Sequence, residues 1–235
     1  MIFKRIAQAG KSILTLNRDR EFAVLKRTLD LKPTDSLLDS GCGDGFWTSR
    51  VAALCQQVIG LESNHTFIGF ARAFHKPPNV TYVRGIAESL PFEDGVFDKI
   101  ISVSSLEHFS DPCRALTEMA RVLKPGGRLG LSVDSLLPEN STRSFREWHK
   151  RRHFVNHYFS EEALKTMLHS AGLRNDIGPT VHLFRSQAAA YLRQIFITRP
   201  RLWLPLFPAF YLTVRIADRI FNDTKGQILV ITAAR

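Results

Sequence analysis

An aspartate at a predicted strand end and three glycines stand close together in residues 37–45, in a pattern that suits ligand binding. Asp39 ends a short apolar run, and Gly41, Gly43 and Gly45 occupy alternate positions after it. Glycines tolerate positive φ angles and let the backbone approach a ligand at the start of a helix. The segment therefore predicts a strand, a glycine-rich turn and a helix that together bind a cofactor.

Two details of this turn distinguish between the cofactors that it could bind. The dinucleotide fingerprint G-x-G-x-x-G would place its third glycine at the position of Phe46. The carboxylate of Asp39 would also repel a pyrophosphate, whereas it would attract the ammonium and sulfonium groups of S-adenosylmethionine. The turn thus favours S-adenosylmethionine, with a nicotinamide dinucleotide as the alternative.

A second acid, Glu62, follows the next apolar run at residues 58–61. It lies about 20 residues beyond the glycine turn, the spacing expected of an acid that accepts hydrogen bonds from ribose hydroxyls. A solvated acid after a strand is the alternative. Because Glu62 stands at a strand end, we favour the ribose role.

Short apolar runs alternate with helical stretches through residues 36–134. This alternation predicts an α/β fold: a doubly wound, mostly parallel, Rossmann-like sheet with helices on both faces and the ligand at the carboxyl ends of the strands. Later runs at 181–184 and 228–232 would close a seven-stranded sheet as an antiparallel pair. Ser160 predicts a helix start and Gly172 its end. The strands are predicted at 36–39, 58–61, 80–84, 99–103 and 128–133, and the helices at 46–55, 66–74 and 112–123, before a turn at 124–127.

Composition and charge narrow the class of protein. The 235 residues are 44% hydrophobic and 23% charged, which indicates a globular protein rather than a disordered one. The three widely spaced cysteines argue against a disulfide framework and favour a reducing, cytoplasmic compartment. The first 20 residues lack a secretory signal pattern and predict an amphipathic helix that packs on the domain or lies on an anionic membrane. The net charge of +10 predicts a surface that attracts anions.

These motifs, in this order, resemble the class I S-adenosylmethionine-dependent methyltransferase family and its small-molecule, type 11-like branch. The resemblance runs from Leu37 to Val133 through LLDSGCGDG, VIGLES, GIAESLPFEDGVFDKII, SLEHFSDP and RVLKPGGRL. It implies that the glycine turn and Asp39 hold the methionine moiety and that Glu62 holds the ribose. Chain length and the pattern along the chain predict one domain over 1–235: an N-terminal helical segment at 1–31, a cofactor-binding core at 36–134 and an acceptor-side part at 135–235.

The resemblance also assigns the rest of the cofactor site. Adenine would lie near Ala87, and the methyl group above Val103. Ile86 stands where the family usually has an aspartate, so the adenine contact falls to backbone or to Glu88. The predicted S-adenosylmethionine site comprises Asp39, Gly41, Cys42, Gly43, Gly45, Glu62, Ser63, Ala87, Glu88, Val103 and Ser104.

Four histidines lie near the predicted acceptor side, one alone and three at regular spacing. His108 is a candidate catalytic base oriented by Glu107, and bracing of the next helix is the alternative. His149, His153 and His157 would share one helix face because they are spaced by four residues. We favour a basic cover over the acceptor pocket for these three, together with Lys150, Arg151 and Arg152, and predict no metal site.

Residues 186–222 predict a helical insertion before the last strand, with a dense apolar run at 202–214. The run is too short to span a bilayer and contains two prolines. A lid or core packing is the favoured interpretation. A peripheral membrane contact and a homodimer interface are the alternatives.

The function predicted from these features is an enzyme that transfers a methyl group from S-adenosylmethionine to a small-molecule or lipid-linked acceptor by in-line displacement. The basic charge motivates an RNA methyltransferase as the alternative, against which we find no base-methylation motif and no aromatic platform. A non-catalytic protein that binds membrane or a partner, and an oxidoreductase that uses NAD, are further alternatives. We predict a cytoplasmic protein, with peripheral membrane association as a variant.

Overall fold

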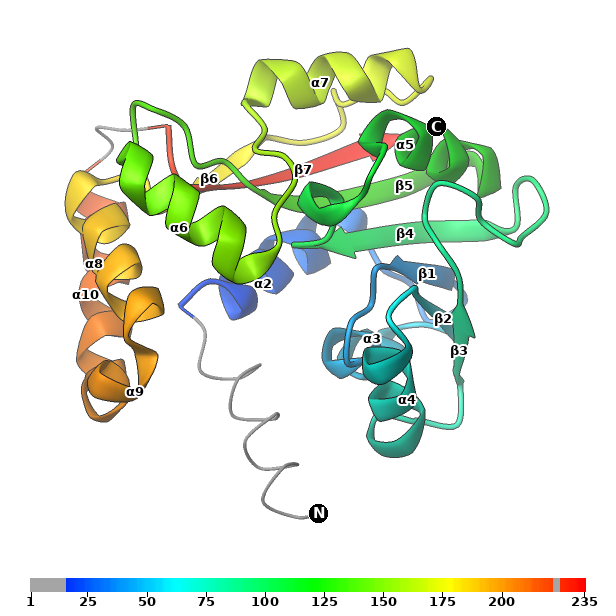
Figure 1. Cartoon of the computed structure of the whole chain (residues 1–235). Coiled ribbons are helices and arrows are strands. Elements are labelled where there is room, and N and C mark those ends of the chain that lie inside the picture. Colours follow the sequence, from blue (N-terminus) through cyan, green and yellow to red (C-terminus); the bar gives the residue numbers. More distant parts are fainter. Residues whose placement is uncertain (1–15, 222–224) are drawn as a thin grey trace.

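The structure, a computed structural model, describes residues 16–221 and 225–235. Seven strands of this part form one sheet in the order β3-β2-β1-β4-β5-β7-β6 (Figure 1). Neighbours among β1 to β5 are parallel, whereas β7 is antiparallel to both β5 and β6. The strands are β1 (Ser36–Ser40), β2 (Gln57–Glu62), β3 (Val80–Arg84), β4 (Phe97–Val103), β5 (Leu123–Asp134), β6 (Val181–Leu183) and β7 (Ile228–Ala234).

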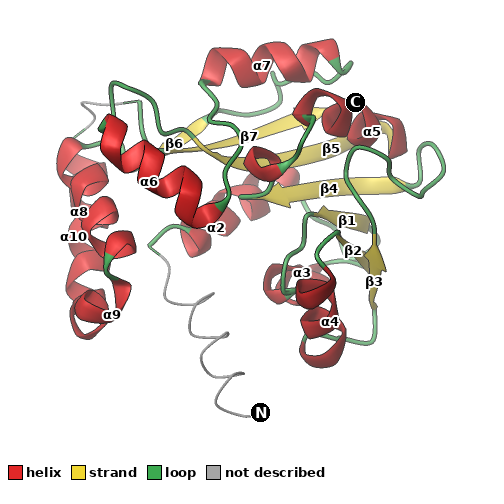
Figure 2. Cartoon of the chain, in the orientation of Figure 1, coloured by secondary structure: helices red, strands yellow, loops and turns green. Residues whose placement is uncertain are grey.

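Helices cover both faces of this sheet, and two main apolar clusters fill the space between the layers. Figure 2 shows α5 and α7 on one face and α2, α3 and α4 on the other. The predicted amphipathic helix at the N-terminus lies outside the described residues except at its end. The helices are α2 (Arg18–Leu29), α3 (Phe46–Val51), η1 (Ala52–Leu54), α4 (His65–Phe74), η2 (Leu106–His108), α5 (Pro112–Val122), α6 (Arg143–His153), α7 (Glu161–Ser170), α8 (Gln187–Thr198), α9 (Pro200–Trp203), η3 (Leu204–Leu206) and α10 (Phe207–Ile220).

The predicted fold class and the late antiparallel pair are confirmed, and two local predictions are wrong. The helix predicted over 46–55 ends at Val51 and continues as the short 3-10 helix η1. The turn predicted at 124–127 belongs to β5 instead. Its glycines pair with the last residue of the chain, since Gly126 donates its N–H to the Arg235 carbonyl (3.1 Å) and Arg235 donates to Gly127 (3.1 Å). Hydrogen bonds to a residue that is distant in sequence therefore hold this segment in the sheet, although its residue types favour a turn.

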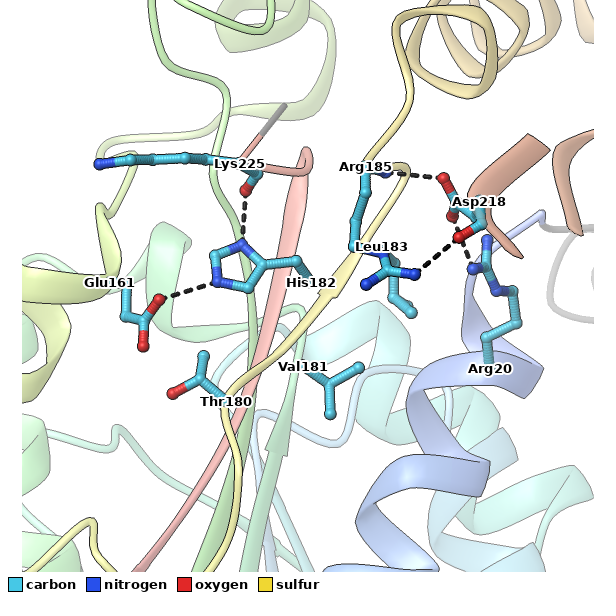
Figure 3. Close-up of a pocket in the computed structure, with 9 residues that line it drawn as sticks. All are labelled: Arg20, Glu161, Thr180, Val181, His182, Leu183, Arg185, Asp218 and Lys225. Carbon is cyan, nitrogen blue, oxygen red and sulfur yellow. Dashed lines mark hydrogen bonds and ion pairs between the residues drawn. The ribbon is translucent and has the colours of Figure 1, made fainter. Parts of the chain in front are cut away.

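The insertion predicted at 186–222 contains α8, α9, η3 and α10, and buried charges fix it to the sheet. Asp218 of α10 is 4% exposed and accepts the backbone N–H groups of Phe184 (2.6 Å) and Arg185 (2.7 Å), directly after β6. The same carboxylate accepts a hydrogen bond from the Arg20 guanidinium of α2 (2.6 Å; Figure 3). From α8, the buried Arg193 donates to Asp134 at the end of β5 (2.8 Å). The insertion is thus anchored at both of its long helices.

Replacing Asp218 by alanine should lower the free energy of unfolding by about 3–5 kcal/mol, because it leaves backbone donors and the Arg20 cation buried without an acceptor. Denaturant unfolding measures this change. The matched control is Glu147→Ala, which removes a carboxylate paired with Arg143 on the exposed side of α6 and should change stability little. Equal, small effects of the two substitutions would contradict the anchoring role of Asp218.

Candidate functional site

The carboxyl ends of β1, β2 and β4 meet at a cavity of about 1010 Å³. Parallel strands bring these ends to one edge of the sheet, where an α/β fold binds its ligands. The predicted site residues that line this cavity are Asp39, Gly41, Cys42, Gly43, Glu62, Ser63, Ala87, Glu88, Val103, Ser104 and His108. Gly45, which was also predicted, does not line it.

The three glycines of the turn after β1 serve different purposes. A Cβ atom on Gly41 would lie 2.6 Å from the Ser105 Cβ, and one on Gly45 would lie 2.5 Å from the Tyr82 hydroxyl. A Cβ atom on Gly43 would meet nothing within 4 Å. All three have positive φ angles. Packing therefore requires glycine at the two outer positions, and only Gly43 exposes open backbone to the cavity.

Asp39 is buried at the end of β1, 2% exposed, where its carboxylate accepts a hydrogen bond from the Thr48 hydroxyl of α3 (2.7 Å). Burial raises the pKa of Asp39 to about 7, and the nearby Glu62 carboxylate adds to this rise, while the Thr48 hydrogen bond opposes it. Among the described residues, no cation forms an ion pair with Asp39 within 4 Å. A bound cation would supply the missing charge.

Glu62 ends β2 with both carboxylate oxygens held by backbone donors. Oε2 accepts the N–H of Gly43 (3.0 Å), and Oε1 accepts the N–H of Asn64 (2.7 Å). Each oxygen has a further lone pair, so the carboxylate can also accept two hydroxyl groups of a ligand. The Gly43 contact fixes Glu62 against the glycine turn, which sequence spacing alone did not indicate.

The end of β4 forms another wall of the cavity. Ser104, directly after Val103, has a left-handed backbone (φ 49°) and donates its N–H to the Ser132 carbonyl (2.9 Å). Such a conformation is uncommon for a residue other than glycine and is found most often at functional sites. The Ser105 hydroxyl then donates to the Gly41 carbonyl (2.8 Å). These bonds join the ends of β4 and β1 beside the cavity.

The wall assigned to adenine differs from the prediction in one respect. Glu88 already accepts the backbone N–H groups of Ser110 (2.8 Å) and Asp111 (3.3 Å) with one carboxylate oxygen. Its carboxylate therefore braces the loop before α5, and an adenine contact through the second oxygen stays a prediction. Ile86 is 52% exposed and lines the cavity. It offers an apolar surface where the resembling family usually has a carboxylate.

His108 lines the cavity, but Glu107 does not orient it as predicted. The Nδ1 atom of His108 lies 3.1 Å from the Phe154 carbonyl, which can only accept, so Nδ1 carries the proton and Nε2 is the basic nitrogen. Glu107 is fully buried and accepts the Asp134 N–H instead (3.3 Å). Burial and the neighbouring Asp134 carboxylate raise the pKa of Glu107 well above its usual value. Both effects favour the protonated form of the carboxyl group.

The predicted row of three histidines is wrong. The helix α6 ends at His153, because Phe154 adopts a left-handed conformation (φ 57°), and His157 lies beyond it. His149 is buried, and burial lowers its pKa to about 4. His153 lines the cavity. In the described ranges, no cluster of three or more metal-ligating side chains is found.

Some residues at the cavity lie outside the predicted cofactor site: Arg18 and Trp47 carried no sequence signal, whereas Arg152 belongs to the predicted basic cover over the acceptor pocket. Arg18 comes from the start of α2 and Arg152 from the last turn of α6, and both line the cavity together with Trp47. Each arginine lies outside the motifs that predicted the site. Only the fold brings them to the strand ends.

A second cavity, of about 520 Å³, lies beside β6 (Figure 3). His182 contacts a Glu161 oxygen (2.8 Å) and the Lys225 carbonyl (2.5 Å) there. Asp218 binds Arg20 on the other side. Because these charged groups form hydrogen bonds and ion pairs with one another, we assign this cavity to the attachment of the insertion and not to ligand binding.

Comparison with known proteins agrees with this geometry. The sequence model of a family described as a methyltransferase domain matches residues 38–131. The biotin biosynthesis bifunctional protein of Cellvibrio japonicus is 33% identical over 180 residues, 73% of this chain and 35% of that protein. The demethylmenaquinone methyltransferase of Shouchella clausii is 35% identical over 109 residues, 44% of this chain and 46% of that protein. The chain spans less than half the length of these two curated relatives.

Among solved structures, an S-adenosylmethionine dependent methyltransferase from Mesorhizobium loti matches with a TM-score of 0.67. The match covers 94% of this chain and 100% of that one at 18% identity. A match at this identity shows the shared fold.

The different surroundings of the glycines predict different effects of alanine on stability. Gly45→Ala should lower the free energy of unfolding by about 2–4 kcal/mol, because strain at positive φ adds to overlap with Tyr82. Gly43→Ala should cost only about 1 kcal/mol, since the strain acts alone there. Urea unfolding of both variants measures the difference. A larger loss for Gly43→Ala would show that the turn packs differently.

Proposed function

We propose that this chain, whose residues 38–131 belong to the class I S-adenosylmethionine-dependent methyltransferase family, transfers a methyl group to a small molecule that carries a negative charge. The observation that carries the proposal is one cavity in which Asp39, Glu62 and the open backbone of Gly43 face the same space, with two arginines at its rim. Relatives named for biotin biosynthesis and for demethylmenaquinone support a small-molecule acceptor.

The residues present fit S-adenosylmethionine. Asp39 forms no ion pair within 4 Å among the described residues, and the charge of Arg18 only partly opposes the effect of burial on its pKa, which suits the cationic methionine end. Glu62 retains acceptor capacity for the two ribose hydroxyls. Ile86 offers an apolar surface for adenine. A volume of about 1010 Å³ exceeds what one ligand of this size requires and leaves room for an acceptor beside it.

The residues of the chain act mainly by positioning. The bound cofactor supplies an already activated methyl group, so catalysis needs the acceptor atom to be aligned with it and water to be displaced. Val103 and the left-handed Ser104 form the wall beside the predicted methyl position. Where the acceptor must lose a proton, His108 Nε2 is the basic nitrogen that lines the cavity.

The charges around the cavity favour an anionic acceptor. Arg18 and Arg152 come from two helices outside the cofactor-binding motifs, and no carboxylate of the described part forms an ion pair with either within 4 Å. His153, beside Arg152, also lines the cavity. Of the four acids that line the cavity, Asp39 and Glu62 are assigned to the cofactor, whereas Glu88 and Asp111 accept backbone N–H groups at the start of α5. The basic side chains are therefore left for a carboxylate or phosphate of the acceptor.

Incubation of the purified chain with cell extract and methyl-labelled S-adenosylmethionine should produce a labelled anionic small molecule, which mass spectrometry detects. Arg18→Gln/Arg152→Gln should then raise the KM for that acceptor at least about tenfold, because charge-assisted hydrogen bonds are lost. Binding of S-adenosylhomocysteine should stay unchanged in Arg152→Gln alone, because Arg18, and not Arg152, acts on the charge of Asp39. The matched control is Arg151→Gln, an exposed neighbour that does not line the cavity. Label in nucleic acid alone would refute the small-molecule proposal.

Cofactor affinity should depend on pH through Asp39. With its pKa raised to about 7, the group is protonated below that pH and then cannot attract a cation. Affinity for S-adenosylhomocysteine should hence fall about tenfold between pH 8 and pH 6, as a proton and the ligand compete. Comparison with Asp39→Asn, which lacks this titration, separates it from ionisation of the ligand. Parallel pH profiles for the two proteins would contradict the role of Asp39.

A further inference from the structure

The outer side of the helical insertion carries exposed apolar side chains. On α10, Leu212, Ile216 and Ile220 are 59%, 48% and 66% exposed. Their spacing of four residues aligns them on one side of the helix. Exposed leucines continue around the corner that joins α8 to α10. We call the outer apolar surface the set of Leu202, Leu204, Leu206, Leu212, Ile216 and Ile220.

The helical insertion packs on the core through the side opposite to this surface. The opposite side of α10 buries Val214 and Ala217 in the apolar cluster beneath it. Asp218, on the same buried side, is bonded to β6 and α2, and Arg193 fixes α8 to β5. Figure 1 shows α8, α9 and α10 together at one side of the molecule. The insertion is therefore docked through its inner side, and its outer side faces away from the core.

The exposed charges of α8, α9 and α10 have one sign, and the acid of another helix that contacts α10 here, Asp19 of α2, accepts a hydrogen bond from Tyr211. No acidic residue occurs between Asp176 and Asp218, a stretch that contains five arginines. Asp218 itself is buried. On α10, the exposed Arg215 and Arg219 lie next to the apolar row, three residues beyond Leu212 and Ile216. An apolar stripe bordered by arginines is typical of helices that lie at the surface of an anionic membrane.

The same charges disfavour a second copy of the chain as the partner. Two outer apolar surfaces placed face to face would bring arginines together without any exposed acid of α8, α9 or α10 to pair with them. Lipid phosphates would instead pair with these cations while the apolar row enters the boundary below the headgroups. No helix within the described ranges is long and apolar enough to cross a bilayer. The geometry thus suits a contact that lies on the membrane.

We propose that the outer apolar surface docks the protein on an anionic phospholipid membrane. Leu212, Ile216 and Ile220 enter the boundary between headgroups and acyl chains, and Arg215 and Arg219 contact lipid phosphates. The contact needs neither the cofactor nor an acceptor, so it is independent of the proposed methyl transfer. It would place the enzyme beside acceptors that reside in the membrane.

Co-sedimentation of the full chain with vesicles tests the proposal. The chain should bind vesicles of phosphatidylcholine mixed with phosphatidylglycerol, and should bind phosphatidylcholine vesicles much more weakly. Leu212→Gln/Ile216→Gln/Ile220→Gln should reduce the partition coefficient at least about tenfold, because apolar burial is lost while glutamine preserves helix propensity. Undiminished binding by this variant would overturn the proposal, as would equal binding to the two kinds of vesicle.

A charge variant gives a second test that does not alter the apolar row. Arg215→Gln/Arg219→Gln should weaken vesicle binding and its salt dependence. The control is Lys26→Gln/Arg27→Gln, which removes the same charge from exposed positions of α2. Equal losses in both variants would overturn the assigned surface.

Sedimentation equilibrium without lipid tests a dimer as the alternative. The wild-type chain should stay monomeric in this experiment. Self-association that the triple variant abolishes would assign the surface to a dimer interface instead. Unchanged S-adenosylhomocysteine binding by the triple variant separates this outcome from failure of the proposed function.

Discussion

The turn after β1 is confined on three sides, and the geometry of the site depends on this confinement. The Leu61 carbonyl accepts the N–H groups of both Gly41 (2.8 Å) and Cys42 (2.9 Å), which joins the turn to the end of β2. Ser105, beyond β4, and Tyr82, in β3, leave no space for side chains at the outer glycines. The turn therefore holds four neighbouring strand ends in one arrangement. Its remaining open backbone, at Gly43, meets Glu62 and the cavity.

Two buried carboxylates at the strand ends differ in whether a cationic side chain pairs with them. Asp134 receives a guanidinium from Arg193, so its charge is matched inside the protein. Asp39 receives only the Thr48 hydroxyl, and burial raises its pKa to about 7. An ionised acid buried without a counter-charge is unfavourable unless a ligand provides one. This difference is the physical reason for assigning the cationic end of the cofactor to Asp39 rather than to another acid nearby.

Features with a strong local signal could be predicted from the sequence, and those that depend on distant partners could not. The alternation of short runs predicted the edge strand β3 with its observed bounds, because the β-branched and aromatic residues at 80–83 favour a strand even though only Tyr82 is buried. The histidine row failed since Phe154 ends α6 in a left-handed conformation that its side chain does not favour. Arg18 and Arg152 reach the cavity from segments more than a hundred residues apart. Likewise, the outward side of α10 is determined by the buried bonds of Asp218, which periodicity does not reveal.

The central claim is that the cavity at the strand ends binds S-adenosylmethionine rather than a dinucleotide. Isothermal titration of the wild-type chain with S-adenosylhomocysteine, and separately with NADH, tests it most directly. The account predicts saturable binding of one S-adenosylhomocysteine per chain and no binding of NADH. Saturable binding of NADH without binding of S-adenosylhomocysteine would contradict the assignment of Asp39, Glu62 and the glycine turn.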